Sequence, residues 1–402
     1  MKTIVLGPPG TGKTETLLRE VEKYLKKTDP NRIGYFSFTQ KAANEGRERA
    51  MDKFNLTEDD LPYFQTLHSL AFRRLGLKKE NVMQREHYAK VGRETGLRVD
   101  YNEWDDEMTG LFTTKSDYLR IIQLAKLKNI TLEQQYNLKE HTQDVSVQKL
   151  KNLSSELESY KKAHGLIDYN DMIEKFINAI YLPDAKVPQF EVIFIDEAQD
   201  LSLIQWKMIQ ALQQYTTDTY IAGDDDQAIF GWAGADVDSF IKFDAVEIPL
   251  KQSKRVPRMI HTRALLRLDN IKSGRLEKPW NTPTSEDGTI KIFFSIDSIN
   301  MQKGDWYILA RTNDLLKPII RGLKKRGLYF ETKQGRSISE SLYRDILHWE
   351  KWKNGKELTT IEIQRLLERF DKKFEETEDK LFKLDELKTK YKLDPRLQWY
   401  DA

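Results

Sequence analysis

Short apolar runs alternate with segments of helical spacing in the first part of the chain. The runs TIVL, RIGYFSF and LPYFQTLHS are followed by amphipathic stretches that begin at Lys13, Gln40 and Leu70. Apolar residues three or four positions apart favour helices, whereas short β-branched and aromatic runs favour strands. The alternation predicts a parallel sheet covered by helices, which is an α/β fold.

Strand signals fade over residues 81–162. Stretches such as SDYLRIIQLAKLKN and VQKLKNLSSELESYKKAH keep helical spacing with charged faces, so a helical insertion is expected here. Strand-like runs return in FEVIFIDEAQD, DTYIAGDDDQ and AVEIPL. The first sheet is therefore predicted to be completed only after the insertion.

A second set of strand-like runs begins near Gly288. The runs TIKIFFS, GDWYILA and LYFETK predict the start of another α/β domain. From about Ser341 the pattern is helical and highly charged, which is typical of solvated helix surface. The predicted organisation is a first domain over 1–80 and 163–250, an insertion over 81–162, a second domain over 251–340 and a charged helical segment over 341–402.

Composition adds limits to this picture. The 402 residues are enough for two to four domains, and 65 Lys and Arg against 63 Asp and Glu give a net charge of +2. Any surface that binds nucleic acid must therefore be local. The absence of cysteine excludes disulfides and thiolate metal sites. No apolar run approaches the about 20 residues of a membrane span, so we expect a cytoplasmic protein, of a cell or of a virus-infected host, without a membrane partner.

The segment GPPGTGKT fits the phosphate-binding pattern G-x-x-x-x-G-K-[ST]. It lies between an apolar strand and an amphipathic helix, as its mechanism requires, and this context disfavours a chance glycine turn. Glycines let backbone amides wrap the phosphates at a helix N-terminus, the lysine reaches the β- and γ-phosphates, and the last hydroxyl binds Mg²⁺. The candidate nucleotide-binding residues are Gly7, Pro8, Pro9, Gly10, Thr11, Gly12, Lys13 and Thr14.

The run VIFIDEAQD supplies the second half of such a site. Its apolar residues predict a buried strand whose C-terminal end delivers Asp196 and Glu197 together. One carboxylate would help to hold Mg²⁺ and the other would activate the attacking water. Adjacent acids can also be ordinary turn residues, but the upstream phosphate loop favours the catalytic interpretation.

Six segments in order resemble motifs Ia, Ib, Ic, II, III and IV of superfamily 1 helicases of the UvrD/Rep/PcrA type. They are YFSFTQKAANEGRERA, FQTLHSLAFRRL, GLIDYNDMI, VIFIDEAQD, IAGDDDQAIFGWAGAD and IPLKQSKRVPRMIHTRALL, and the resemblance covers roughly residues 3–335. Similar phosphate loops occur in AAA+ ATPases, but QTLHS and GDDDQAIFGWAGAD disfavour that alternative. The resemblance implies a RecA-like motor domain 1A with a helical insertion 1B, then a partial second RecA-like domain 2A and the start of a domain 2B.

The resemblance also implies residue roles at the nucleotide. ATP and Mg²⁺ are the expected ligands, with Asp196 on the metal side and Glu197 as the base. Gln227 in DDDQ matches the γ-phosphate sensor that also couples to the DNA track. Arg255 in QSKRVP matches the motif IV arginine that reaches the γ-phosphate from the second motor domain.

Single-stranded DNA is the partner that the resemblance implies. Phe38 and Trp232 match aromatic residues that stack on bases, which suits a motor because every base has a π-face. Thr39, Thr66 and His68 lie in motifs Ia and Ib, whose polar groups contact the DNA. Core packing is the alternative for the two aromatic residues, a structural role is the alternative for His68, and RNA remains open as the track.

This sequence departs from the family pattern at the base of the nucleotide. No segment with the family's adenine-reading glutamine precedes the loop, and Glu15 and Lys254 stand where an arginine and a stacking aromatic residue are common. We therefore expect weaker discrimination of ATP from GTP than in typical relatives. In motif III, Ala233 stands where the family often has arginine, so one polar link near the DNA track is expected to be missing.

The region after Gly335 contains no match to motif V or to motif VI, which carries the family's arginine finger. We expect an ATP-dependent 3′ to 5′ helicase motor whose isolated activity is weak. Three explanations are open: a fragment of a longer protein, half of a split helicase completed by a second chain, or a naturally short protein. In the last case it would be a nucleotide-gated DNA-binding subunit without motor activity.

Overall fold

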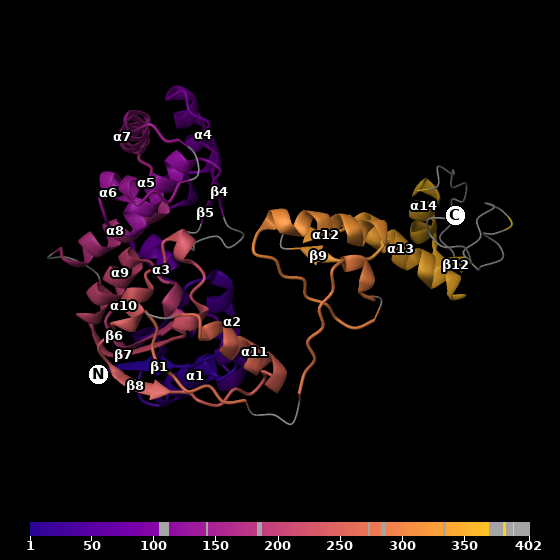
Figure 1. Ribbon diagram of the computed structural model, residues 1–402, viewed down its shortest axis with the longest axis horizontal. Coiled ribbons are helices and arrows are strands. Elements are labelled where there is room, and N and C mark those ends of the chain that lie inside the picture. The colour runs from indigo at the N-terminus through magenta and orange to yellow at the C-terminus, as the bar shows by residue number, and fades with distance from the viewer. Residues whose placement is uncertain are drawn as a thin grey trace. The chain divides into compact units, whose positions relative to one another are not determined.

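The computed structural model divides the chain into two compact units, Met1–Ile290 and Lys291–Ala402 (Figure 1). It describes residues 1–103, 112–141, 144–182, 187–271, 274–282, 287–301, 303–332, 335–369, 381–382 and 389. No helix within these ranges is long and apolar enough to cross a membrane.

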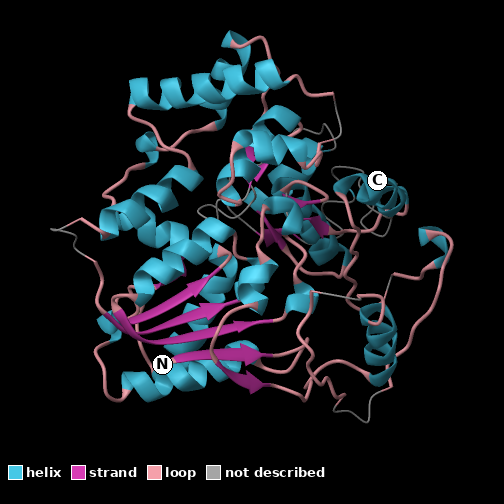
Figure 2. Ribbon diagram, turned by 60° about the vertical axis from the view of Figure 1, so that its left-hand side comes forward, coloured by secondary structure: helices cyan, strands magenta, loops and turns pink. Residues whose placement is uncertain are grey.

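A six-stranded parallel sheet forms the centre of the first unit. Its strands are β1 (Lys2–Leu6), β2 (Ile33–Ser37), β3 (Phe64–Thr66), β6 (Phe190–Asp196), β7 (Thr216–Gly223) and β8 (Val246–Pro249). The order across the sheet is β3-β2-β6-β7-β1-β8, and Figure 2 shows the arrows pointing the same way. The predicted α/β fold and its strands on both sides of the insertion are confirmed.

Helices cover both faces of this sheet because the strands bury alternate residues on each face. Tyr35 and Phe194 belong to a core on one face, whereas Phe36 and Ile195 belong to a core on the other. The first core includes α1 (Lys13–Leu25) and α2 (Gln40–Phe54). The second core includes α3 (Leu67–Arg74), α8 (Tyr169–Ile180) and α9 (Leu203–Gln213).

The expected insertion is helical in the structure. Its elements are α4 (Arg85–Glu94), the short strands β4 (Asn102–Glu103) and β5 (Phe112–Thr113), α5 (Asp117–Leu127), α6 (Leu132–Asn137) and α7 (Val147–His164). The chain leaves and returns side by side, because Val82 and Ile167 form a parallel bridge and Met83 N donates to Ile167 O at 2.9 Å. Part of the predicted insertion, residues 104–111, lies outside the described residues.

The first unit continues beyond its sheet through α10 (Val237–Ile241), which precedes β8, and α11 (Arg258–Leu268), which follows it. A segment over 274–282 then returns to the motif IV region. Ser253 N donates to Asn281 O at 2.9 Å, and Asn281 N donates to Lys251 O at 2.7 Å. This returning segment is called the strap below, because it connects motif IV to motif III.

The second unit differs from the expectation of a sheet. Neither the segment 289–295, which begins two residues before this unit, nor the segment 304–310 contains a strand, so the prediction of strands in TIKIFFS and GDWYILA is wrong. A strand requires a neighbour that shares its backbone hydrogen bonds, and the described neighbours provide none for these two segments. The elements present are α12 (Asn313–Lys325), β9 (Glu331–Thr332), β10 (Gly335–Arg336), α13 (Glu340–Lys353), β11 (Leu358–Thr359), α14 (Thr360–Arg369) and β12 (Leu381–Phe382).

The helical structure predicted for the segment 341–402 is confirmed over α13 and α14. These helices bury Trp349, Trp352 and Leu366 against one another. The remainder of the highly charged sequence, from residue 370, lies almost entirely outside the described residues.

Candidate nucleotide-binding site

The loop after β1 folds tightly over its own backbone. Gly10 and Gly12 have φ of +78° and +89°, in the left-handed region that glycine adopts without strain. The Lys13 ammonium donates to Gly7 O at 3.0 Å, and Thr11 Oγ1 donates to Pro8 O at 2.8 Å. Because α1 begins directly after the loop, its free amides and the lysine form a site suited to phosphate groups.

Thr14 and Asp196 meet at the base of this loop. The Thr14 hydroxyl donates to Asp196 Oδ2 at 2.8 Å, although the residues are 182 positions apart in sequence. Asp196 is 5% exposed at the end of β6. A hydroxyl and a carboxylate are hard oxygen donors of the kind Mg²⁺ prefers, so these two residues fit the implied metal.

Burial shapes the electrostatics of this carboxylate. Burial and the neighbouring charge of Glu197 raise the pKa of Asp196, whereas hydrogen bonds from Tyr35 and Thr14 act in the opposite direction. A cation on Asp196 would relieve the cost of a buried negative charge. The electrostatics therefore agree with a metal site at the end of β6.

Glu197 has φ of +52°, an uncommon conformation for a residue other than glycine. Strain of this kind costs about 1–3 kcal/mol and clusters at functional sites. The Gln199 amide donates to Glu197 Oε2 at 3.0 Å and to Asp200 Oδ2 at 3.2 Å. The strained turn and the Gln199 hydrogen bond together fix where the predicted base lies.

Gln199 also connects motif II to motif III. Its carbonyl oxygen accepts from Asp224 N at 3.1 Å, while its amide holds Glu197 and Asp200. Burial, together with the charge of Glu197, raises the pKa of Asp200 to about 7. Gln199 and Asp200 both lie in the run VIFIDEAQD, but the motif does not reveal which side chains they contact.

Motif III brings Gln227 to a group of three aspartates. The Gln227 amide donates to Asp224 Oδ2 at 2.6 Å. The strap residue Lys278 is 9% exposed, and its ammonium lies 3.0 Å from Asp224, 2.5 Å from Asp225 and 2.9 Å from Asp226. The strap thus supports the aspartate that holds the predicted γ-phosphate sensor.

Arg255 lies against the phosphate loop, and its predicted contact with the γ-phosphate stays a prediction. A Cβ placed on Gly10 would come within 2.8 Å of Arg255 Cγ and 3.4 Å of its Nε. Lys254 N donates to Gly10 O at 2.8 Å. Motif IV and the phosphate loop are therefore in direct contact within the first unit, and Gly10 is the residue that permits this approach.

The two residues expected to alter adenine recognition have partners or neighbours at the loop. Glu15 accepts from Lys53 at 2.9 Å and also pairs with Arg19. Lys254 Nζ would lie 3.6 Å from a Cβ on Gly12. Weak discrimination between ATP and GTP stays a prediction.

Predicted DNA contacts divide into exposed and buried groups. Trp232 is 49% exposed, whereas Phe38 is 6% exposed and packs against Phe230 with ring centroids 5.2 Å apart. Phe230 in turn lies 6.3 Å from Trp232. The Trp232 ring is thus open to solvent while the Phe38 ring is packed, and base stacking by either residue stays a prediction.

Thr39, Thr66 and His68 lie at the starts of α2 and α3. The two threonine hydroxyls are helix N-caps, because each accepts at 3.1 Å from a backbone amide three residues later. His68 is 2% exposed and lies edge-on to Tyr169, and burial lowers its pKa to about 4. A neutral, buried imidazole fits the structural alternative, while DNA contacts by these residues stay a prediction.

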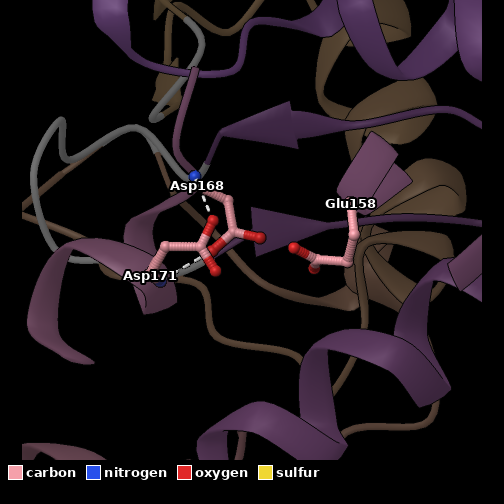
Figure 3. A group of neighbouring side chains, drawn as sticks. All are labelled: Glu158, Asp168 and Asp171. Atoms are coloured by element: carbon pink, nitrogen blue, oxygen red, sulfur yellow. Dashed lines mark hydrogen bonds between the residues drawn. The ribbon is translucent and has the colours of Figure 1, made fainter. Parts of the chain in front are cut away.

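Three carboxylates, in α7 and at the start of α8, lie close enough to suggest a metal site but are paired with two lysines. Figure 3 shows Glu158, Asp168 and Asp171 turned towards one another. The ammonium of Lys126 lies 2.8–3.0 Å from all three, and that of Lys161 lies 2.5–3.1 Å from all three. Burial would lower the pKa of Lys126, but Asp168 and Asp171 outweigh it and raise that pKa. The cluster is a charge-paired connection between helices.

Sequence reasoning missed three contributors to the site. Tyr35 lies in a predicted strand, yet its hydroxyl donates to Asp196 Oδ2 at 2.8 Å. Gln199 lies in the run VIFIDEAQD, and Lys278 lies in the run RLEKPW, which matches no motif. All three depend on partners brought together by the fold, so only the position of Gln199 beside Glu197 offered a local signal.

Comparisons with known proteins agree with this geometry. The family model described as UvrD/REP helicase N-terminal domain matches residues 1–246, which include β1 and β6 with the loop and acids that follow them. The ATP-dependent DNA helicase PcrA of Bacillus subtilis (strain 168) is 24% identical over 364 residues, which cover 86% of this chain and 48% of the relative.

Two further relatives are also named as DNA helicases. DNA helicase II of Escherichia coli (strain K12) is 26% identical over 328 residues, covering 74% of this chain and 42% of the relative. The ATP-dependent DNA helicase Rep of Buchnera aphidicola subsp. Baizongia pistaciae (strain Bp) is 24% identical over 253 residues, covering 59% of this chain and 35% of the relative. The chain thus spans less than half the length of the curated relatives it matches.

Proposed function

Because the chain belongs to the UvrD/REP helicase N-terminal domain family, we propose that it is the nucleotide-binding part of an ATP-dependent motor on single-stranded DNA. The motor would move 3′ to 5′ and couple ATP hydrolysis to strand separation. The observation that carries the proposal is the meeting of Thr14, Asp196 and Arg255 at one phosphate loop. The names of the DNA helicase relatives support DNA as the track.

Positive groups at the loop would bind the ATP phosphates. Amides at the start of α1, Lys13 and Arg255 surround the loop. Charge-assisted hydrogen bonds to phosphate are stronger than neutral ones. We therefore expect the γ-phosphate to be the most tightly bound phosphate group in this arrangement. Arg255 would release the γ-phosphate after hydrolysis, which gives the loop and motif IV two nucleotide-dependent states.

Glu197 would act as the base in hydrolysis. Its carboxylate would accept a proton from the attacking water as the water oxygen bonds to the γ-phosphorus and the bond to the β–γ bridging oxygen breaks. Thr14 and Asp196 would hold Mg²⁺, which supplies positive charge for the phosphate oxygens when bound. Gln227, held by Asp224, would register the γ-phosphate and pass its presence to motif III.

Motif III would connect the nucleotide to the track. Gln227 is followed by Phe230 and Trp232, and the tryptophan ring is half exposed. Stacking of a base on an aromatic ring contributes about 1–3 kcal/mol and tolerates any sequence. A movement of motif III on hydrolysis would therefore shift the group that holds the DNA.

We also propose that residues carrying motifs V and VI, in this polypeptide or in a second chain, complete the second unit. The segments 289–295 and 304–310 expose large apolar side chains to solvent. Ile292 is 80%, Phe294 is 102%, Tyr307 is 93% and Leu309 is 91% exposed. Contiguous exposed apolar surface marks sites of protein interaction, and these strand-like sequences suit pairing with strands of the partner.

The alternative function is a nucleotide-gated DNA-binding subunit without motor activity of its own. The observation that favours it is the same pair of strandless segments in the second unit, since a motor needs two folded domains around the γ-phosphate. The two functions differ in whether a partner with motifs V and VI exists.

ATP hydrolysis by the purified chain, with and without single-stranded DNA, tests these functions. We expect nucleotide-dependent DNA binding but slow hydrolysis, and acceleration on the order of 10³ to 10⁵ when a polypeptide carrying motifs V and VI is added. Binding without acceleration would favour the subunit alternative. Lys13→Met is the control, because it removes the phosphate contact and should abolish the nucleotide effect on DNA binding.

Rapid DNA-stimulated hydrolysis by the chain alone would contradict the need for a partner. Absence of nucleotide binding at any Mg²⁺ concentration would contradict both functions. Fluorescence anisotropy of a labelled oligonucleotide measures DNA binding. Replacing the DNA by RNA of the same sequence tests whether the chain binds DNA or RNA.

A further inference from the structure

A buried tyrosine hydroxyl lies beneath the metal-side carboxylate, on a neighbouring strand. We propose that Tyr35 is a positioning residue that orients Asp196 for Mg²⁺, an inference that rests on the proposed nucleotide site. The Tyr35 hydroxyl donates to Asp196 Oδ2 at 2.8 Å, and Tyr35 is completely buried. Because the residue is completely buried, its effect on metal binding must act through the carboxylate.

Three donors fix the orientation of Asp196. Tyr35 and Thr14 both donate to Oδ2 at 2.8 Å, and Glu197 N donates to Oδ1 at 3.0 Å. Thr14 is itself a proposed metal-binding residue, and Glu197 follows Asp196 in a strained turn. Tyr35 is thus the donor to this carboxylate that comes from a rigid strand outside the phosphate loop and the catalytic turn.

The sheet and its core hold the tyrosine ring in place. β2 pairs in parallel with β6, in a register that sets Tyr35 beside Phe194 and Ser37 beside Asp196. The ring stacks on Phe64 with centroids 5.0 Å apart and planes 8° apart. A ring held between strands leaves its hydroxyl little freedom, which is what a group that orients a metal-binding carboxylate requires.

Helix α2 makes room for this ring with a glycine. A Cβ placed on Gly46 would lie 2.7 Å from Tyr35 Cε1 and 3.2 Å from Cζ. Glycine within a helix costs about 1 kcal/mol relative to alanine, so its presence in the middle of α2 calls for a local reason. The tyrosine ring supplies that reason, and both residues belong to one arrangement beneath the site.

Removing a group that hydrogen-bonds a metal ligand typically lowers metal affinity by about 10 to 100-fold. Tyr35→Phe deletes the hydroxyl and keeps the stacked ring. We expect the Mg²⁺ concentration for half-maximal binding of a fluorescent ADP analogue to rise by about 10-fold in this variant. Excess Mg²⁺ should restore nucleotide binding, because the phosphate contacts are intact.

Tyr24→Phe is the matched control. Tyr24 belongs to the same core as Tyr35, and its hydroxyl also donates to a carboxylate, that of Asp218 at the opposite part of the sheet. The control therefore makes the same chemical change without touching Asp196. We expect its Mg²⁺ dependence to equal that of the wild type, and thermal unfolding of both variants separates metal affinity from stability.

Mg²⁺ titrations of nucleotide binding to the full chain test the proposed role of Tyr35. A shift in Tyr35→Phe alone supports the proposal. An unshifted Tyr35→Phe, or equal shifts in both variants, overturns it while the proposed nucleotide site stands, provided that the wild type binds nucleotide with Mg²⁺. A wild-type chain that binds no nucleotide overturns the proposed function and this inference with it.

Discussion

The end of β6 and the segment 304–310 carry similar sequence signals but reach different structures. Both are short apolar runs with aromatic and β-branched residues. β6 lies between β2 and β7, and its Ile195 is completely buried, whereas Leu309 is 91% exposed. The difference shows that an apolar run becomes a strand only where neighbouring strands can pair with it.

The same contrast separates what each unit can do. At the ends of β1 and β6 the sheet brings Thr14 and Asp196 within 2.8 Å, so catalytic groups far apart in sequence form one site. The described part of the second unit has two-stranded pairings and helices but no such edge. We therefore propose that the nucleotide chemistry belongs to the first unit and that motifs V and VI complete the second.

The largest expected effect concerns Glu197 in the first unit. Glu197→Gln keeps the size of the side chain and its contact with Gln199 but removes the proton acceptor. We expect the rate of ATP hydrolysis to fall by about 10² to 10⁴-fold, because that is the usual contribution of a general base. Single-turnover hydrolysis measures the rate, and unchanged affinity for nucleotide is the control. Unchanged hydrolysis by the Glu197→Gln variant would show that Glu197 is not the general base.

A second substitution tests the strap that supports motif III. Lys278→Met removes the cation from a buried group of three aspartates, and breaking such a pairing costs about 3–5 kcal/mol. Urea unfolding measures the change. Lys242→Met is the matched control, because the Lys242 side chain is 74% exposed and solvent screens its pairing with Asp238, so we expect little change in stability. Equal losses of unfolding free energy in the two variants would show that Lys278 of the strap does not stabilise motif III.

A paired truncation addresses the comparison of the two units directly. Ile195→Ala should destabilise the chain by about 2–5 kcal/mol, because it opens a cavity in a packed core. Leu309→Ala should change stability by no more than about 0.5 kcal/mol, because the side chain is already in solvent. The free energy of unfolding of each variant is the measurement. A large loss in Leu309→Ala would mean that the second unit packs this residue after all.

The smallest effect is a pH dependence within the first unit. The pKa of His68 falls from an ordinary value of 6.5 to about 4, because the ring is buried. A depressed folded-state pKa means that stability from the neutral ring is present above pH 6.5 and is lost as the pH falls towards 4. The loss should amount to about 3 kcal/mol at most. Comparison with His68→Gln over this pH range measures it, and parallel pH profiles would refute the burial of His68.

Local sequence was enough to predict the first unit wherever neighbouring residues define the structure. The strand, glycine loop and helix at Lys13 are contiguous, and Asp196 and Glu197 follow directly from a buried run. Local sequence was not enough where a partner is distant. Tyr35 acts on a residue 161 positions away, and Lys278 reaches Asp225 across 53 positions.

The strand predictions in the second unit failed for a related reason. Apolar alternation in 289–295 and 304–310 is a property of the run itself, whereas pairing depends on strands elsewhere. The pattern therefore indicates the capacity to form a strand and leaves the partner unspecified. Phe294 and Tyr307 are 102% and 93% exposed, in segments that do not form strands.

Hydrogen exchange along the chain, with and without Mg²⁺ and ADP, tests the central claim most directly. Slowly exchanging amides are expected in β1, β6 and β7, and nucleotide should slow exchange further in residues 7–14. Rapid exchange is expected in 289–295 and 304–310, because the backbone there is not paired in strands. Strong protection of 289–310 in the isolated chain, or no effect of nucleotide on the phosphate loop, would contradict this account.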